Sequence, residues 1–195
     1  MSRLPRLLLA SSSPRRLALL RQIHLMPAVL PVDVDESVLE GEAPEAYVRR
    51  LALAKAQAGR TRADDAEAWV VAADTTVVAG GQILGKPTSF ADAQRIWALL
   101  PSPDHCVYTG IAVMHGDHIE VEVVSTRVEF LLIPEADQLA YWNSDEPKDK
   151  AGAYAVQGRA AQYVKSLHGS YTNVVGLPLA ETVALLRRAN YPLWE

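Results

Sequence analysis

Two adjacent arginines stand at the start of a predicted helix. In the segment "ASSSPRR", residues 10–16, Ser13 followed by Pro14 is typical of a helix start, because serine caps a helix and proline suits its first position. A helix N-terminus carries unpaired N–H groups and about half a unit of positive charge, which makes Arg15 and Arg16 slightly unfavourable there. A bound phosphate would reverse that cost. The segment therefore indicates either an anion site or a plain capped helix with solvated arginines.

Two carboxylates follow predicted strands. Asp74 ends an apolar strand predicted over residues 69–74, and Glu36 closes an acidic stretch at the end of a strand predicted over residues 28–36. A carboxylate at a strand end can hold Mg²⁺ or accept a proton from water. Clustered acids also repel one another, which favours a cation close to Glu36. Each residue, taken alone, is also compatible with an ordinary turn.

Two lysines occupy unusual places in the sequence. Lys55 falls one residue from the apolar stripe of a helix predicted over residues 44–59, where its side chain either snorkels or points into a pocket. Lys86 stands between Gly85 and Pro87 on a constrained loop, so its stem has a defined direction. A solvated loop lysine is the ordinary alternative for Lys86.

The charged candidates balance one another. The cations are Arg15, Arg16, Lys55 and Lys86, and the acids are Glu36 and Asp74. This balance suits a polyphosphate with a divalent metal ion. Farther along, glycines and small residues surround Gln157, so a ligand could approach the backbone closely and the amide could read the edge of a base.

The predicted elements alternate between strands and helices. Strands are expected over residues 6–10, 69–74, 106–114, 119–132, 153–156 and 162–167, with a hairpin turning at Gly80–Gly81. Helices are expected from Pro14, over residues 44–59, from Ser89 to Leu100, from Pro134 to Trp142 and from Leu179 to Ala189. Hairpins interrupt the alternation, which predicts an α/β fold with a mixed twisted sheet and flanking helices.

The composition is that of an ordinary globular protein. The chain has 195 residues, 49% hydrophobic and 22% charged, with a net charge of −4, which argues against a nucleic-acid-binding face. The single cysteine, Cys106, cannot form an internal disulfide. The apolar run near the N-terminus is too short for a signal peptide, and no run reaches the length of a membrane span. We therefore expect a cytoplasmic protein that binds neither nucleic acid polymers nor membranes.

Taken together, the motifs resemble those of a Maf-family nucleotide pyrophosphatase. The matching segments occur in family order and are "LLLASSSPRR", "DVDE", "LALAKA", "VVAADTTVV", "LGKP", "HCVYTGIAV", "DKAGAYAVQG" and "GSYTNVVGLPL". The resemblance implies a hydrolase that converts a nucleoside triphosphate to the monophosphate and pyrophosphate with Mg²⁺ or Mn²⁺. It implies one Maf/ITPase-like domain over residues 1–195, with two lobes around a central nucleotide-binding cleft, and a homodimer.

The resemblance also assigns roles by motif. Asp74 matches the catalytic acid/base, while Arg15, Thr75 and Gln157 match positions linked to substrate choice. The remaining pocket positions match Ser11, Arg16, Glu36, Lys55 and Lys86. We therefore predict the catalytic residues to be Asp74, Glu36, Lys55 and Lys86, with Glu36 and Asp74 as metal ligands. The predicted substrate-binding residues are Ser11, Arg15, Arg16, Thr75 and Gln157.

The segment "AYAVQG" resembles the dTTP/UTP branch of the family, because the 7-methyl-GTP branch has an acid at the position of Gln157. Alternatives stay open at this stage. These are a 7-methyl-GTP pyrophosphatase, an enzyme that removes modified pyrimidine nucleotides, and a nucleotide-binding regulator of septum formation without turnover. Which carboxylate is the base and which the metal ligand does not follow from the sequence.

Overall fold

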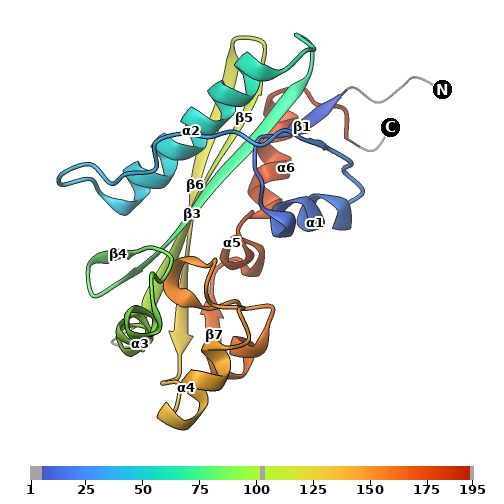
Figure 1. The fold of residues 1–195 in the computed structure, drawn as a ribbon. Coiled ribbons are helices and arrows are strands. Elements are labelled where there is room, and N and C mark those ends of the chain that lie inside the picture. Colours follow the sequence, from blue (N-terminus) through green and yellow to red (C-terminus); the bar gives the residue numbers. More distant parts are fainter. Residues whose placement is uncertain (1–5, 102–103, 194–195) are drawn as a thin grey trace. The chain divides into compact units, whose positions relative to one another are not determined.

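The computed structural model describes residues 6–101 and 104–193 and contains a mixed sheet (Figure 1). Within this part of the chain the sheet has seven strands in the order β2-β1-β3-β5-β6-β7, with β4 paired to β3. The strands are β1 (Leu7–Leu9), β2 (Ala28–Val29), β3 (Trp69–Ala79), β4 (Gln82–Leu84), β5 (His105–His115), β6 (His118–Phe130) and β7 (Val164–His168). Strand β1 is parallel to β2 and β3, whereas β3–β4 and β6–β7 are antiparallel. The predicted α/β class with a mixed sheet is confirmed.

Helices flank this sheet. They are α1 (Pro14–Gln22), α2 (Pro44–Arg62), α3 (Phe90–Leu99), α4 (Glu135–Trp142), α5 (Tyr171–Val175) and α6 (Leu179–Arg188), with short 3-10 helices η1 (Ala151–Ala153) and η2 (Arg159–Tyr163). The chain divides into two compact units. Unit 1 comprises residues 1–74, 109–124 and 176–195, and unit 2 comprises residues 75–108 and 125–175. The cleft predicted between two lobes, and the reading of the chain as one domain, stay predictions.

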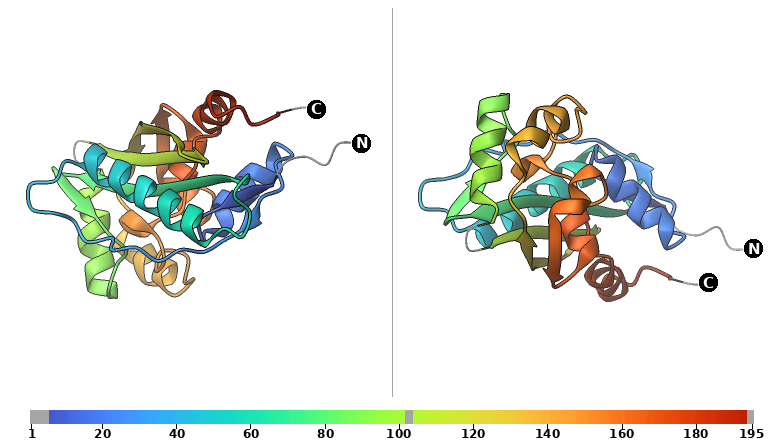
Figure 2. Two further views of the ribbon diagram at one scale, coloured as in Figure 1. Left: turned by 90° about the horizontal axis from the view of Figure 1, so that it is seen from above. Right: turned by 90° about the horizontal axis from the view of Figure 1, so that it is seen from below.

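In unit 1, helix α2 lies against one face of the sheet and runs along it (Figure 2). A Cβ added at Gly59 would lie 2.8 Å from the Cβ of Ala10 and 2.9 Å from a methyl carbon of Val70. A Cβ added at Gly110 would lie only 2.2 Å from the carbonyl oxygen of Val48. These two glycines therefore allow the helix backbone to approach the strands closely.

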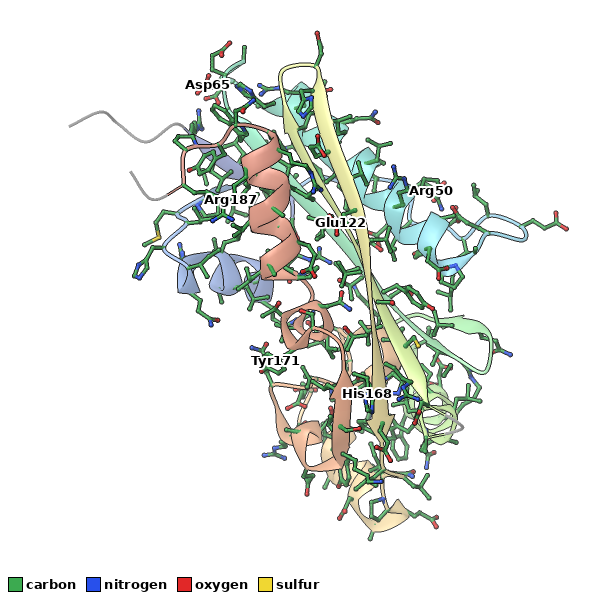
Figure 3. The ribbon with its side chains drawn as sticks, turned by 180° about the vertical axis from the view of Figure 1, so that it is seen from behind. Arg50, Asp65, Glu122, His168, Tyr171 and Arg187 are labelled. Carbon is green, nitrogen blue, oxygen red and sulfur yellow. The ribbon has the colours of Figure 1, made fainter. Side chains whose placement is uncertain are left out.

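Helix α6 covers the opposite face of the sheet in unit 1. Figure 3, seen from behind, shows Arg187 on α6, Glu122 on β6 and Arg50 on α2, with the strands between the two helices. The Nε and Nη2 atoms of Arg188 donate to the carboxylates of Glu120 and Glu122 at 2.9 and 3.0 Å. Strand β3 is thus covered on both faces in unit 1, which explains why its residues from Trp69 to Asp74 are all buried rather than every second one.

Unit 2 has its own core around Trp97 of α3, whose side chain is fully buried. The indole Nε1 of Trp97 donates to the carbonyl of Ala153 at 2.7 Å and so joins α3 to η1. His105 is also fully buried, with Nδ1 3.2 Å from the Leu100 carbonyl and Nε2 2.8 Å from the hydroxyl of Tyr154. Because a carbonyl can only accept, Nδ1 carries the proton of the neutral ring and Nε2 accepts from Tyr154.

Several local predictions are confirmed. The β3–β4 hairpin turns at Gly80–Gly81, and both glycines have positive φ, as a two-residue turn requires. Ser89 caps α3, since its hydroxyl accepts the Asp92 N–H at 3.1 Å. Helix α1 begins at Pro14 as expected, but Ser13 makes no side-chain capping bond. Ser13 occupies the N-cap position as predicted, but the hydroxyl that accepts in this turn belongs to Ser11, which takes the N–H of Ser13 at 3.2 Å.

Two predicted strands were wrong. Only Ala28–Val29 of the stretch 28–36 is a strand, because the chain has Pro31 and leaves the edge of the sheet after β2. Residues 154–158 form an extended connection and a turn rather than the strand predicted over 153–156, since η1 precedes them, the Ala155 N–H donates to the hydroxyl of Tyr141 and the Gly158 N–H closes a turn on the Ala155 carbonyl. The described residues contain no helix long and apolar enough to cross a membrane.

Candidate active site

Lys55 joins the two predicted acids in unit 1. Its Nζ lies 2.7 Å from Oδ1 of Asp74 and 2.5 Å from Oε1 of Glu36. Lys55 and Asp74 are buried, with relative exposures of 8% and 7%. Buried charges of this kind persist only when each has a partner, and the geometry supplies one. The three residues therefore form one charged cluster.

The elements explain why this cluster forms. Strands β1 and β3 are parallel, with Leu9 opposite Val71, so Asp74 lies three residues past the last β1–β3 pair. The prediction that Asp74 ends its strand was wrong, because β3 continues to Ala79 through its pairing with other strands of the sheet. Asp74 nevertheless lies beside the carboxyl end of β1, and ligands of α/β proteins bind at the carboxyl ends of strands. Lys55 lies one helical turn before Gly59, one of the two positions at which α2 and the strands pack without room for a side chain. Tight packing of α2 thus brings the ammonium group to the carboxylate.

Ser11 and Arg16 follow the carboxyl end of the parallel strand β1. The hydroxyl of Ser11 accepts from Nη1 of Arg16 at 3.1 Å, and Nε of Arg16 donates to the carbonyl of Gly176 at 2.8 Å. Burial lowers the pKa of Arg16, while the carboxylate of Asp74 acts in the opposite direction. The guanidinium group of Arg16 is therefore held by Ser11 and Gly176, and it lies close enough to Asp74 for the two charges to attract. Arg15 is half-buried at the same helix start.

Glu36 stands on a loop that is tied to α2. The hydroxyl of Tyr47 donates to the Glu36 carbonyl at 2.9 Å. Arg50 donates to the Ser37 carbonyl at 2.9 Å and makes two bonds of 2.7 Å to the carboxylate of Glu42. Burial and the carboxylates of Asp74 and Glu36 raise the pKa of Tyr47 to about 12, so its hydroxyl remains a donor.

Tyr47 and Arg50 were missed by the sequence reasoning. The sequence feature that could have indicated them is their position. Both lie on the helix that carries Lys55, within eight residues of it, and Arg50 also lies eight residues from its partner Glu42. Nothing local in the sequence shows that they hold the loop of Glu36, because the bonds run to backbone carbonyls.

The cluster fits a divalent cation. Glu36 and Asp74 both direct a carboxylate oxygen at one ammonium group, so they already converge on a positive charge. Among the residues that the structure describes, no group of three or more His, Cys, Asp or Glu side chains is arranged as a metal site. Mg²⁺ is typically held by one or two carboxylates together with substrate phosphates and water, so two acids suffice.

The other predicted site residues belong to unit 2. Thr75 follows Asp74 directly on β3 and is half-buried. Lys86 is exposed on the loop after β4, where the Gly152 N–H donates to the Gly85 carbonyl at 3.2 Å. Gln157 is exposed in a turn after η1.

The structure thus brings together a subset of the predicted residues in unit 1. These are Ser11 with Arg16, and Glu36 with Lys55 and Asp74. Chemically, this set offers oxygen ligands for a cation, a carboxylate that can take a proton from water, and positive charge for a phosphate. The roles of Arg15, Thr75, Lys86 and Gln157 stay predictions.

The comparisons with known proteins cover nearly the whole chain. A family model described as Maf-like protein matches residues 6–189, a range that includes every predicted site residue. A dTTP/UTP pyrophosphatase of Myxococcus xanthus (strain DK1622) is 50% identical over 187 residues, which are 96% of this chain and 94% of that protein. A dTTP/UTP pyrophosphatase of Anaeromyxobacter dehalogenans (strain 2CP-C) is 50% identical over 196 residues, 98% of each chain. Among solved structures, a HAM1 protein from Coxiella burnetii matches with a TM-score of 0.48 and 16% identity, over 68% of this chain and 76% of that chain.

Proposed function

Because the chain belongs to the family of Maf-like proteins, we propose that it hydrolyses dTTP and UTP to the nucleoside monophosphate and pyrophosphate. The relatives named dTTP/UTP pyrophosphatases are about as long as this chain and match it almost end to end. The observation that carries the proposal is the buried contact of Lys55 with Glu36 and with Asp74, which lies within strand β3, just past the end of its pairing with β1. Such a cluster supplies three things that phosphoanhydride hydrolysis needs: a carboxylate that accepts a proton from water, oxygen ligands for a cation, and positive charge for the phosphates.

The charged residues of unit 1 have different roles in the proposed reaction. The Asp74 carboxylate takes a proton from water as the water oxygen bonds to the α-phosphorus, and the bond from that phosphorus to the bridging oxygen breaks to release pyrophosphate. Lys55 and Arg16 offset the negative charge that accumulates on the phosphate oxygens. Glu36 and Asp74 would hold Mg²⁺ or Mn²⁺, which supplies further neutralisation of the triphosphate.

We assign base selection to Gln157 of unit 2. Uracil and thymine present an N3–H donor beside carbonyl acceptors, which one amide can match with one acceptor and one donor. Guanine presents two adjacent donors, which a carboxylate accepts better. In support, Gln157 is exposed and its amide is available to a ligand. Arg15, Thr75 and Lys86 complete the proposed binding set, in which the charges of Arg15 and Lys86 would pair with the triphosphate.

A nucleotide-binding regulator of septum formation without turnover is the second candidate. It needs no carboxylate beside a polyphosphate, because an acid there weakens anion binding. The buried placement of Asp74 on Lys55 therefore favours chemistry over binding alone.

We also propose that the protein acts in the cytoplasm, where its nucleotide substrates are made, and as a homodimer, as the family resemblance implies.

The test is a panel of nucleoside triphosphates assayed with Mg²⁺ for pyrophosphate release. UTP and dTTP should give the highest kcat/KM, ahead of CTP and 7-methyl-GTP. Gln157→Glu should lower kcat/KM for UTP by about tenfold to a hundredfold, because a carboxylate faces the carbonyls of uracil, and should favour 7-methyl-GTP in relative terms. Faster hydrolysis of 7-methyl-GTP than of UTP and dTTP by the unaltered protein would contradict the base assignment. Tight nucleotide binding without turnover would support the regulator instead.

A further inference from the structure

Gln157 lies in a tight turn of unit 2. The turn spans Ala155 to Gly158 and is closed by a bond of 3.1 Å from the Gly158 N–H to the Ala155 carbonyl. An amide side chain can present its oxygen or its nitrogen to a base, so it distinguishes uracil from cytosine only when the amide is held in one orientation, and that requires a backbone with a fixed position. The residues that fix this turn therefore bear on base selection.

Both flanks of the turn are bonded to one pair of side chains, Tyr141 and Glu146. On the entering side, the Ala155 N–H donates to the hydroxyl of Tyr141 at 3.3 Å, and that hydroxyl donates to Oε1 of Glu146 at 2.8 Å. On the leaving side, the Arg159 N–H donates to Oε2 of Glu146 at 2.8 Å and the Ala160 N–H reaches Oε1 at 3.4 Å. One carboxylate thus accepts bonds that restrain the chain before and after Gln157.

Steric contact between Gly158 and Glu146 leads to the same conclusion. A Cβ added at Gly158 would lie 2.1 Å from Oε2 and 2.3 Å from Cδ of Glu146, much closer than atoms can approach. Gly158 has a negative φ, so its conformation does not demand glycine. The absence of a side chain there is explained by the carboxylate, which fills the space against the turn.

The pair is itself anchored in the core of unit 2. Tyr141 is only 4% exposed and packs against Trp97, with ring centroids 5.5 Å apart. Just before the turn, the buried Tyr154 bonds His105 at 2.8 Å. The turn of Gln157 therefore rests on rigid side chains rather than on a mobile surface loop.

We infer that Glu146, acting through Tyr141 and the amides of Arg159 and Ala160, is the positioning residue that fixes the turn of Gln157 and so sets selectivity for uracil and thymine over cytosine. The inference rests on the proposed function, in which Gln157 reads the base. Glu146 is not proposed to touch the substrate. It acts by holding the turn of Gln157 in one orientation.

The experiment compares kcat/KM for UTP and CTP in Glu146→Gln, Tyr141→Phe and a matched control. The control is Asp145→Asn, because Asp145 is the neighbouring acid, is exposed and directs its carboxylate to Lys148. In Glu146→Gln an NH₂ group replaces one carboxylate oxygen and cannot accept the bonds that this oxygen accepts. The ratio of kcat/KM for UTP to that for CTP should therefore fall about tenfold. Tyr141→Phe should shift the ratio in the same direction by a smaller factor, and Asp145→Asn should leave it unchanged.

Amide exchange gives a readout without substrate. In Glu146→Gln the amides of Arg159 and Ala160 should exchange faster than in the unaltered protein, while those of α3 should not change. An unchanged UTP/CTP ratio in folded Glu146→Gln, even with a lower Tm, would mean that Glu146 is only structural and would overturn the inference. If Glu146→Gln does not fold, Tyr141→Phe decides the question by the same ratio.

A Gln157→Ala variant separates the inference from the proposed function. If Gln157→Ala lowers the UTP/CTP ratio and Glu146→Gln does not, the inference alone is wrong. If Gln157→Ala keeps the ratio, Gln157 does not read the base, and the positioning role of Glu146 is overturned with it.

Discussion

At the residue scale, Asp74 is the most informative position. Its carboxylate lies on the Lys55 ammonium, which also contacts Glu36. Removing the charge of Asp74 therefore leaves Lys55 with one acidic partner, so the buried ammonium is not stranded. Activity and folding can be separated at this residue.

We predict that Asp74→Asn lowers kcat for UTP by about 10²- to 10⁴-fold, because an amide cannot take a proton from water. The circular dichroism spectrum should be unchanged. The measurement is steady-state pyrophosphate release, with Asp64→Asn as control, since Asp64 is 76% exposed and pairs with Arg6. A folded Asp74→Asn protein with near-normal turnover would refute the catalytic assignment.

A second residue prediction concerns pH and His105. Burial lowers the pKa of His105 from 6.5 to about 4 in the folded state. The unfolded state therefore binds a proton below pH 6.5 that the folded state does not, so stability is complete above that pH and falls as the pH drops toward 4. Between pH 7 and pH 5 this group should reduce the free energy of unfolding by about 2 kcal/mol.

Urea unfolding at the two pH values measures this effect. His105→Gln should lower stability at pH 7 and flatten the pH dependence, because an amide does not titrate. His118→Gln is the matched control, since His118 is exposed beside Glu120. An equal slope in His105→Gln and the unaltered protein would exclude His105 as its source.

At the element scale, the seating of α2 determines the geometry of the site. Gly110 contacts the helix backbone itself, so an added methyl group cannot be relieved by a side-chain rotation. We predict that Gly110→Ala destabilises the protein by about 1–3 kcal/mol through overpacking. It should also lower kcat, because Lys55 moves with α2.

The measurement for Gly110→Ala is the free energy of unfolding in urea. Gly85→Ala serves as the control, because a Cβ there meets nothing within 4 Å and Gly85 has no positive φ. Equal stability of the two variants would show that α2 shifts without cost.

At the scale of the whole molecule, three strands run from unit 1 into unit 2 without a break. Strand β3 passes from Asp74 to Thr75, and β5 and β6 cross the same division. Because a strand cannot lose its pairing in one half without affecting the other, we predict one cooperative unfolding transition. Amide exchange in α2 of unit 1 and α3 of unit 2, followed through urea, should give the same midpoint. Separate midpoints would show that the units unfold independently.

The sequence by itself determined most of the local elements and the residue types of the site. The turn at Gly80–Gly81 and the cap at Ser89 depend on neighbouring residues, whose conformational preferences are local. The strand–turn–helix at Ser11 to Arg16 follows from the same kind of preference. The family motifs then named the candidate residues.

Only the tertiary structure decided which side chains meet. The contacts of Lys55 with Glu36 and Asp74 join segments about twenty residues apart, and they depend on the depth at which α2 packs. The predicted strand 28–36 ended at Val29, and Glu36 is held by Tyr47 of α2 rather than by a strand partner. The role of Glu146 was likewise invisible in the sequence, since its carboxylate bonds backbone amides, which every residue type except proline carries.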